Sequence, residues 1–271
     1  MSLAAPRPPA VAPKALPHAF DDYVRLCERV RALCGVDLLQ YKRPQMERRI
    51  RAWAERRGTP QLGTYARRLE ADAGELAGLL DRVTINVSQL WRHPEQWEQL
   101  AGDVLPELAR RGPIRAWSAG CSYGAEAYTL AAVCRDALPG ACVEIRGTDL
   151  DARMIERART GSFTAEDART APAEPLARHF PGGAASAEVR RMTSFEVGDL
   201  LRMPIPAGHF DLVLCRNTVI YFTEEVRDAL HRRLAASLKP GGQLVVGTSE
   251  RVVEPGALGL VASFPFMYRK A

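Results

Sequence analysis

Hydrophobic positions recur at two different spacings, and the change between them divides the chain into two parts. Over residues 18–92, apolar side chains such as Tyr23, Leu26, Cys27 and Val30 stand three or four residues apart. This spacing gathers them on one face of a helix. The pattern predicts a small helical domain over 18–92, with helices at about 20–35, 44–57, 62–71 and 75–83.

Beyond Pro113, short apolar strands alternate with helices. The expected strands are 114–118, 143–149, 195–197, 210–215 and 243–247, and the expected helices are 125–137, 151–159 and 224–237. Such alternation is typical of a parallel, doubly wound α/β sheet. We therefore expect an α/β domain over residues 93–271, in which the stretch around 261–268 supplies a closing antiparallel strand.

Two stretches lack a regular pattern. Residues 1–17 contain five prolines among alanines, a composition that cannot bury enough surface to fold, so the sequence predicts a disordered tail. Residues 160–194 are interrupted by prolines and glycines. This second stretch is expected to be an insertion or a small subdomain between a helix and the next strand.

Composition narrows the class of protein. Of 271 residues, 46% are hydrophobic and 25% are charged, which excludes a wholly disordered, collagen-like or coiled-coil chain. The apolar runs are too short to cross a bilayer, and no secretory signal is visible. Six cysteines without a C-x-x-C pair or a metal-binding spacing suggest reduced thiols in the cytoplasm. We therefore predict no metal site and no membrane insertion.

The amino-terminal third is the basic part of the chain. Residues 18–92 carry 14 basic and 10 acidic side chains, whereas residues 93–271 carry slightly more acids than bases. This excess indicates an acidic partner: a nucleic acid, an anionic surface or an acidic protein. The second predicted helix would present the basic side chains Arg48, Arg49, Arg51 and Arg56. The alternative is a solvated basic face without a partner.

Four predicted strands end in residues suited to ligand binding. The carboxyl ends of parallel strands meet at one edge of a sheet, where ligands bind. The first strand leads into the sequence Ser-Ala-Gly-Cys-Ser-Tyr-Gly, which contains Gly120 and Gly124. Glycines let the backbone approach a ligand before a helix begins. An ordinary glycine turn explains the same residues equally well.

The second strand ends at Asp149, 25 residues after Gly124. A carboxylate at this place typically accepts hydrogen bonds from the ribose hydroxyls of an adenosine cofactor. A helix cap is the alternative, but Asp151 is better placed for capping, so we assign Asp149 to the ribose. Glu126 lies in the first turn of the helix after Gly124, where the helix dipole alone favours an acid. In a cofactor site, the same carboxylate would contact a cationic amino group.

The remaining strand ends carry Asp199–Leu200 and Arg216–Asn217, with Tyr221 one turn further on. Asp199 would contact an adenine amino group, or it belongs to a plain strand-end turn. Arg216 and Asn217 would be polar groups at the ligand-binding edge of the sheet, and Tyr221 would direct its hydroxyl at the reacting group. Alternatively, Arg216 forms a structural ion pair and Tyr221 is half-buried core.

A glycine loop with a distal acid fits either a dinucleotide or S-adenosylmethionine. Ser118 stands where the first glycine of the dinucleotide motif belongs, which weakens the pyrophosphate interpretation. S-adenosylmethionine has no phosphate, and its sulfonium and amino groups are positive. The acids around the predicted pocket therefore favour S-adenosylmethionine over the anionic dinucleotide of a nicotinamide oxidoreductase.

From about residue 18 onward, the chain resembles the CheR-type chemotaxis receptor methyltransferases. Four motifs carry the resemblance: Cys-Arg-Asn-Thr-Val-Ile-Tyr-Phe at 215–222, Trp-Ser-Ala-Gly-Cys-Ser at 117–122, Leu-Lys-Pro-Gly-Gly at 238–242 and Gly-Thr-Ser-Glu at 247–250. The resemblance implies a class I methyltransferase-like α/β domain that binds S-adenosylmethionine, joined to a small all-helical domain.

The resemblance also implies roles for individual residues. The family's segment before the α/β domain corresponds to residues 84–92, which makes Asn86, Ser88 and Arg92 cofactor-binding. Glu126 would hold the methionine end, Asp149 the ribose, and Asp199 with Leu200 the adenine. The other implied cofactor-binding or methyl-transfer residues are Gly120, Arg216, Asn217 and Tyr221.

The family's reaction transfers a methyl group from S-adenosylmethionine to receptor glutamates and leaves S-adenosylhomocysteine. A glutamate is already ionised at neutral pH, so no strong general base is needed. Arg92 would orient the acceptor carboxylate and Tyr221 would position its oxygen or the methyl group, which makes these two the expected catalytic pair.

Several positions depart from the family pattern. Leu90–Trp91 replaces two phenylalanines, Ala125 and Ala127 replace other motif residues, and Asp199 replaces asparagine. Residues 160–194 are shorter than the family's three-stranded insertion, which docks a receptor tail peptide in some members. These departures motivate an alternative function: a non-catalytic CheR-like module that binds S-adenosylmethionine or a signalling partner. A nucleic-acid substrate is unlikely, because the basic helix lacks an aromatic stripe.

Overall fold

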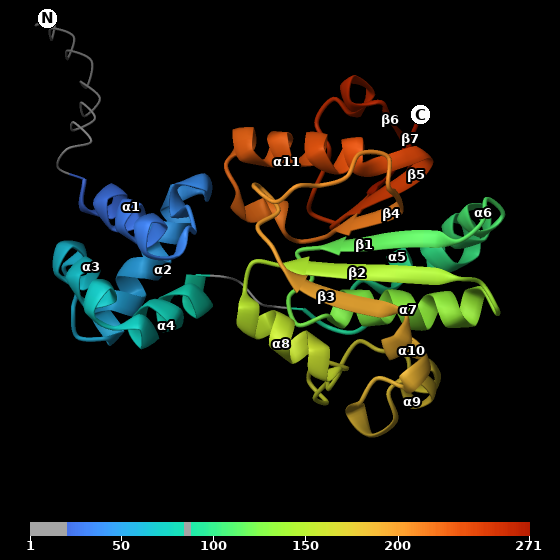
Figure 1. Ribbon diagram of the computed structural model, residues 1–271, viewed down its shortest axis with the longest axis horizontal. Helices are drawn as coiled ribbons and strands as arrows, with labels where there is room; N and C mark the ends of the chain where they lie inside the picture. Colours follow the sequence, from blue (N-terminus) through green and yellow to red (C-terminus); the bar gives the residue numbers. More distant parts are fainter. Residues whose placement is uncertain (1–20, 84–87) are drawn as a thin grey trace, which may run out of the picture. The chain divides into compact units, whose positions relative to one another are not determined.

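The computed structural model describes residues 21–83 and 88–271, which divide into two units (Figure 1). The first unit runs to Leu39 and resumes over Arg43–Val83. The second consists of Gln40–Lys42 and the described chain from residue 88 to Ala271. The predicted tail at 1–17 and the predicted site residue Asn86 lie outside the described residues.

Four α-helices make up most of the first unit: α1 (Asp22–Cys34), α2 (Arg43–Arg56), α3 (Leu62–Ala71) and α4 (Ala73–Val83). Helix α1 begins where the Asp21 carboxylate accepts hydrogen bonds from the backbone N–H groups of Tyr23 and Val24. It ends at Gly35, whose φ of 79° is the left-handed conformation that glycine adopts without steric cost. The helices predicted from periodicity are therefore present, with α4 starting two residues earlier than expected.

The second unit is built on a seven-stranded sheet in the order β3-β2-β1-β4-β5-β7-β6 (Figure 1). Its strands are β1 (Ile114–Ala119), β2 (Val143–Asp149), β3 (Thr193–Val197), β4 (Phe210–Cys215), β5 (Leu238–Val246), β6 (Leu260–Phe264) and β7 (Met267–Lys270). The first five pair in parallel, whereas β7 runs antiparallel to β5 and β6. This is the predicted doubly wound, mostly parallel α/β fold.

The end of the chain differs from the prediction of one closing strand. It forms two strands, because the backbone reverses between β6 and β7 at Pro265 and Phe266, and Phe266 has a φ of 62°. Strand β5 also starts at Leu238, earlier than the predicted residue 243.

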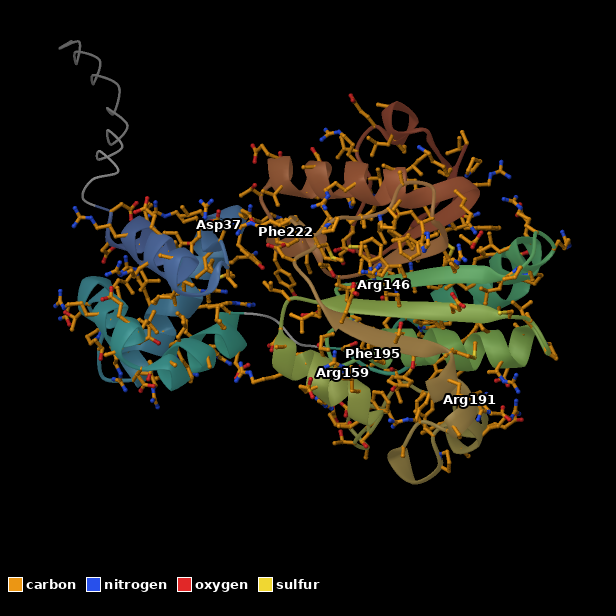
Figure 2. The ribbon with its side chains drawn as sticks, in the orientation of Figure 1. Asp37, Arg146, Arg159, Arg191, Phe195 and Phe222 are labelled. Atoms are coloured by element: carbon orange, nitrogen blue, oxygen red, sulfur yellow. The ribbon has the colours of Figure 1, made fainter. Side chains whose placement is uncertain are left out.

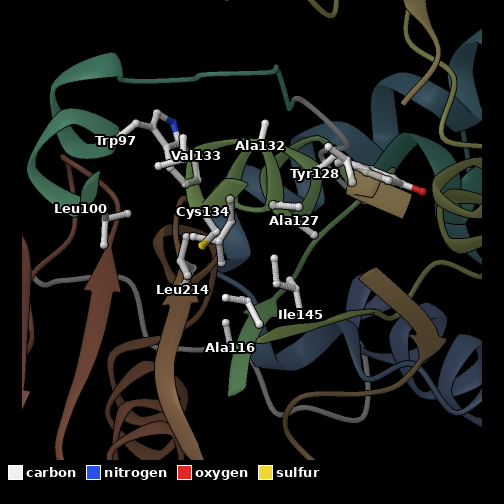
Figure 3. Close-up of a cluster of buried hydrophobic side chains, with 14 of the residues drawn as sticks. Trp97, Leu100, Ala116, Ala127, Tyr128, Ala132, Val133, Cys134, Ile145 and Leu214 are labelled. Atoms are coloured by element: carbon white, nitrogen blue, oxygen red, sulfur yellow. The ribbon is translucent and has the colours of Figure 1, made fainter. Parts of the chain in front are cut away.

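The longer helices of this unit are α7 (Ala125–Ala137), α8 (Ala152–Thr160) and α11 (Glu224–Ser237). Strand β4 shows that both faces of the sheet are covered. Leu212 and Leu214 belong to one buried apolar cluster, and Val213 and Cys215 belong to another. A strand that is apolar at every position is expected where both faces are buried. Figure 3 shows the cluster that α7 shares with Ile145 and Leu214.

Two further regions complete the second unit. Before β1 the chain forms α5 (Pro94–Gln99), one π-helical stretch (Leu100–Val104) and α6 (Leu105–Ala109), for which periodicity gave no prediction. The predicted insertion contains α9 (Ala173–His179) and α10 (Ala187–Arg191). Between α8 and β3, where every residue is described, there is one isolated bridge, Ser162 with Ala184, and no strand.

Candidate functional site

The first predicted site element is the glycine loop after β1. Gly120 and Gly124 have φ angles of 83° and 85°, and Ser122 between them has a φ of 49°. A Cβ on Gly120 would lie 2.5 Å from Oγ1 of Thr218, too close for any real side chain. Gly120 therefore lets the loop after β1 approach the loop after β4, which brings two of the predicted strand ends together.

Asp149 stands at the end of β2 and faces this loop. Its Oδ2 accepts the backbone N–H of Ser122 at 2.7 Å, and its Oδ1 accepts that of Asp151 at 3.0 Å. Asp151 caps helix α8 by accepting hydrogen bonds from the backbone N–H groups of residues 153 and 154, as expected. Burial raises the pKa of Asp149. Two backbone donors thus fix the carboxylate and leave further lone pairs for a ligand such as a ribose diol.

Glu126 and Arg216 form a buried pair at the centre of the site. Oε1 of Glu126 accepts the Ser118 hydroxyl at 2.7 Å, and its Oε2 lies 3.4 Å from Nη1 of Arg216. Burial raises the pKa of Glu126 and lowers that of Arg216, but each charge has its partner. Arg216 therefore forms the ion pair expected in the alternative interpretation, and its partner is Glu126.

Arg216 also joins the site to the segment before α5. Its Nε donates to Oε1 of Gln96 at 2.8 Å, and its Nη2 donates to the carbonyl oxygen of Arg92 at 2.6 Å. Its guanidinium lies 4.9 Å from the centre of the Trp97 ring, a cation–π distance. One buried cation thus anchors the backbone of Arg92, a predicted catalytic residue.

Residues 88–93 are held from several sides. The Tyr123 hydroxyl donates to the carbonyl oxygen of Ser88, and the backbone N–H of Trp91 donates to Oγ1 of Thr129 at 3.1 Å. Trp91 and His93 have φ angles of 53° and 59°, a conformation that side chains rarely adopt. These contacts place Ser88 and Arg92 in the second unit, which differs from the predicted helical domain over 18–92.

The departures Leu90 and Trp91 are core residues of the second unit. Leu90 is fully buried and Trp91 is 4% exposed, and the Trp91 ring packs edge-on against Phe180 at 5.8 Å. Hydrogen bonds join both the N–H and the carbonyl of Leu90 to the loop that contains Asp167 and Thr170. These replacements therefore pack the segment against the predicted insertion.

The loop after β4 contains Asn217 and Tyr221. Asn217 has a φ of 59°, and its N–H donates to Oε2 of Glu250 at 2.8 Å. The other oxygen of Glu250 accepts the N–H of Val219 at 3.0 Å. Glu250 is 3% exposed. The sequence shows Glu250 only as the last residue of the Gly-Thr-Ser-Glu motif that follows β5, and nothing in that polar stretch indicates that its side chain is buried.

Asp199 and Leu200 follow β3. One oxygen of Asp199 accepts the N–H of Leu201 at 2.8 Å, and the other lies 3.6 Å from Nε of Arg202. This is the plain strand-end turn considered above, and Leu200 is buried in the same apolar cluster as Trp117. The predicted adenine contact stays a prediction.

The arrangement suits a cationic nucleoside. A positive-φ glycine loop, a carboxylate with free acceptor positions and a buried acid lie at the carboxyl edge of the sheet, so S-adenosylmethionine fits these residues. Among residues 21–83 and 88–271, no three His, Cys, Asp or Glu side chains gather as a metal site. No helix in those ranges is long and apolar enough to cross a membrane.

The strand order and the mostly parallel pairing are those of the class I S-adenosylmethionine-dependent methyltransferase fold. The family model "CheR methyltransferase, SAM binding domain" matches residues 86–263, and "CheR methyltransferase, all-alpha domain" matches residues 21–84. The chain therefore belongs to the CheR methyltransferase family.

Full-length relatives agree with this assignment. The chain is 32% identical to the chemotaxis protein methyltransferase of Listeria monocytogenes, over 94% of this chain and 99% of the relative. It is 33% identical to chemotaxis protein methyltransferase 1 of Pseudomonas aeruginosa, over 80% and 85%. It is 30% identical to the chemotaxis protein methyltransferase of Salmonella typhimurium, over 83% and 82%.

Proposed function

We propose that this chain transfers the methyl group of S-adenosylmethionine to glutamate side chains of chemoreceptor-like signalling proteins in the cytoplasm. The observation that carries the proposal is the pair of backbone hydrogen bonds that aims the Asp149 carboxylate beside the glycine loop. A carboxylate fixed at the end of the second strand is the group that recognises the ribose of an adenosine cofactor.

The bound cofactor supplies an electrophilic methyl group on a positive sulfur. A bond forms between a glutamate oxygen and the methyl carbon while the carbon–sulfur bond breaks, which leaves a methyl ester and the neutral thioether S-adenosylhomocysteine. No proton is transferred, because the acceptor carboxylate is ionised at neutral pH. The protein therefore has to align the reacting groups and exclude water.

Arg92 and Tyr221 are the proposed catalytic residues. The guanidinium of Arg92 orients the acceptor carboxylate through its fork of donors, and the Tyr221 hydroxyl positions the attacking oxygen. Arg216 anchors the backbone of Arg92, and Glu250 anchors the loop that contains Tyr221, so the backbone at both residues is held in place. The proposed cofactor contacts are Asn86, Ser88, Arg92, Gly120, Glu126, Asp149, Asp199, Leu200, Arg216 and Asn217.

The proposed docking surface for the acceptor protein is the basic side of α2. Arg51 is paired with Asp22 at 2.8 Å, so its charge is partly neutralised within the unit. Arg49 is half-buried, whereas Arg48 and Arg56 are exposed. Glutamate-rich receptor helices are acidic, so this surface would speed their association.

Two measurements test the function. Titration calorimetry with S-adenosylhomocysteine should detect binding, and membranes rich in receptors should accept radiolabelled methyl groups. Arg92→Ala and Tyr221→Phe should each lower transfer by about tenfold or more and leave the fold intact. Wild-type transfer in both variants would make the catalytic assignment wrong.

The alternative, a non-catalytic module, predicts binding without transfer in the same experiment. The burial of Leu90 and Trp91 argues against it, because these two departures are accounted for by packing in the core of the second unit. Charge reversal of Arg48 and Arg56 to Glu should weaken capture of receptor fragments and spare cofactor binding. Equal loss of both would contradict the docking surface.

A further inference from the structure

Three residues of the amino-terminal region belong to the second unit. Gln40–Lys42 pairs with the chain after β4: the N–H of Lys42 donates to the carbonyl of Tyr221 at 2.8 Å, and the N–H of Thr223 donates to the carbonyl of Gln40 at 3.0 Å. Between these bonds, Tyr41 forms an antiparallel bridge with Phe222. The segment is thus fixed directly beside a proposed catalytic residue.

The ring of Tyr41 packs against that of Phe222. Its centre lies 4.9 Å from that of Phe222, labelled in Figure 2, with the ring planes tilted by 51°. Tyr41 is a half-buried member of the apolar cluster that also contains Leu200 and Val219. Leu200, which is proposed to lie against the adenine, belongs to this same cluster.

The hydroxyl of Tyr41 is available to a ligand. It forms no hydrogen bond to any of the described residues, although two acids lie near enough to act on it electrostatically. Burial, together with the charges of Asp199 and Asp149, raises the pKa of Tyr41, so the phenol stays protonated and can donate. These two acids are the ones proposed to hold the adenine and the ribose.

We propose that Tyr41 is a cofactor-binding residue that contacts the adenosine end of S-adenosylmethionine, with its ring against the nucleoside and its hydroxyl as a hydrogen-bond donor. The inference rests on the proposed function, since it takes the nucleoside to lie between Asp149 and Asp199. A role confined to packing on Phe222 is the competing explanation, and it needs no hydroxyl.

The test compares Tyr41→Phe and Tyr41→Ala with the wild-type chain, using calorimetric titration of S-adenosylhomocysteine and of adenosine alone. A lost neutral hydrogen bond should weaken both ligands by about three- to tenfold in Tyr41→Phe. Loss of the ring as well should weaken them further in Tyr41→Ala. Because the contact is to the nucleoside, the fold-change should be the same for both ligands.

Tyr23→Phe is the matched control. The Tyr23 hydroxyl is buried without a hydrogen-bond partner among the described residues, and it lies in the first unit. We expect wild-type affinity in this variant, and unchanged thermal midpoints without ligand in both Phe variants. Should Tyr41→Phe bind both ligands as the wild-type chain does, the proposal for Tyr41 is overturned while the proposed function stands. Failure of the wild-type chain to bind S-adenosylhomocysteine would instead refute the proposed function.

Discussion

The carboxylate of Glu250 holds the backbone of Asn217 in a left-handed turn, with 2.8 Å between the Asn217 nitrogen and Oε2. The same oxygen accepts the N–H of Gly247 at 2.6 Å, and Oε1 accepts those of Val219 and Ile220 at 3.0 and 3.3 Å. Four backbone donors therefore converge on one buried side chain. Burial nevertheless raises the pKa of Glu250. This side chain sets the shape of the loop that contains the proposed site residues.

Glu250→Gln should destabilise this loop more than its similar volume suggests. The amide offers one oxygen where the carboxylate offers two, so its NH₂ group would face backbone N–H donors. We expect a loss of about 1–3 kcal/mol in the free energy of unfolding, measured by urea denaturation, and slower methyl transfer. Glu225→Gln, at an exposed position of α11, is the control. Equal stability of the two variants would show that the carboxylate does not shape the loop.

Asp149→Asn should weaken cofactor binding strongly. The substitution removes a charge and one acceptor from the group proposed to receive both ribose hydroxyls, and turns an NH₂ toward the donors at Ser122 or Asp151. We expect the dissociation constant of S-adenosylhomocysteine to rise by about 10- to 100-fold, the scale of hydrogen bonds to a charged group. Asp151→Asn keeps a good helix cap and should bind normally. Unchanged affinity in Asp149→Asn would remove the ribose assignment.

Affinity for the cofactor should fall at mildly acidic pH. Burial raises the pKa of both Glu126 and Asp149, so each takes up a proton at a higher pH than an exposed carboxyl group does. Protonation removes the negative charge that attracts a cationic ligand. Calorimetry with S-adenosylmethionine from roughly pH 8 to pH 5 should show this loss, and Glu126→Gln should flatten part of the profile. A flat wild-type profile would contradict both assignments.

His231 should make the fold sensitive to acid. It is 1% exposed in α11, and neither ring nitrogen has a hydrogen-bond partner within the described part of the chain. Burial lowers its pKa from 6.5 to about 4. The unfolded chain therefore binds a proton below about pH 6.5 that the folded chain refuses until about pH 4. The free energy of unfolding should therefore fall by about 3 kcal/mol in total as the pH drops from about 6.5 to about 4.

His231→Leu should remove this part of the pH dependence. Urea denaturation between roughly pH 7 and pH 4 should show a smaller decline than in the wild-type chain. His209→Gln, at a half-exposed position, serves as the control. The assignment is wrong if His231→Leu and the wild-type chain lose stability in parallel.

The sequence predicted those features that depend on neighbours along the chain. Helix α7 and strand β2 have their predicted bounds, because Gly124 precedes the helix and Pro139 and Gly140 separate it from the strand. Asp151 caps α8, as predicted from its position directly before the helix. Parallel pairing then brings the ends of β1, β2 and β4 to one edge, so the sequence predicts that Asp149 and Arg216 lie at the same edge of the sheet.

What escaped prediction depends on contacts between distant residues. Arg216 meets Glu126 across 90 positions, and periodicity says nothing of such a pairing. Tyr41 lies between two predicted helices, and nothing in the sequence indicates that it pairs with Phe222 in an antiparallel bridge. The end of the chain forms two strands, with Phe266 at a positive φ in the turn between them. A phenylalanine gives no indication in the sequence that the backbone adopts this conformation.

The bridge between Tyr41 and Phe222 has a consequence for dividing the protein. The chain leaves the helical unit for only three residues, Gln40–Lys42, and then returns to it. A cut after Val83 would therefore give a fragment of the second unit that lacks Tyr41. The Phe222 ring, on which Tyr41 packs, would then be exposed. Swapping helical regions between relatives would carry this tyrosine position along, so the proposed contact of Tyr41 predicts that such exchanges also change cofactor affinity.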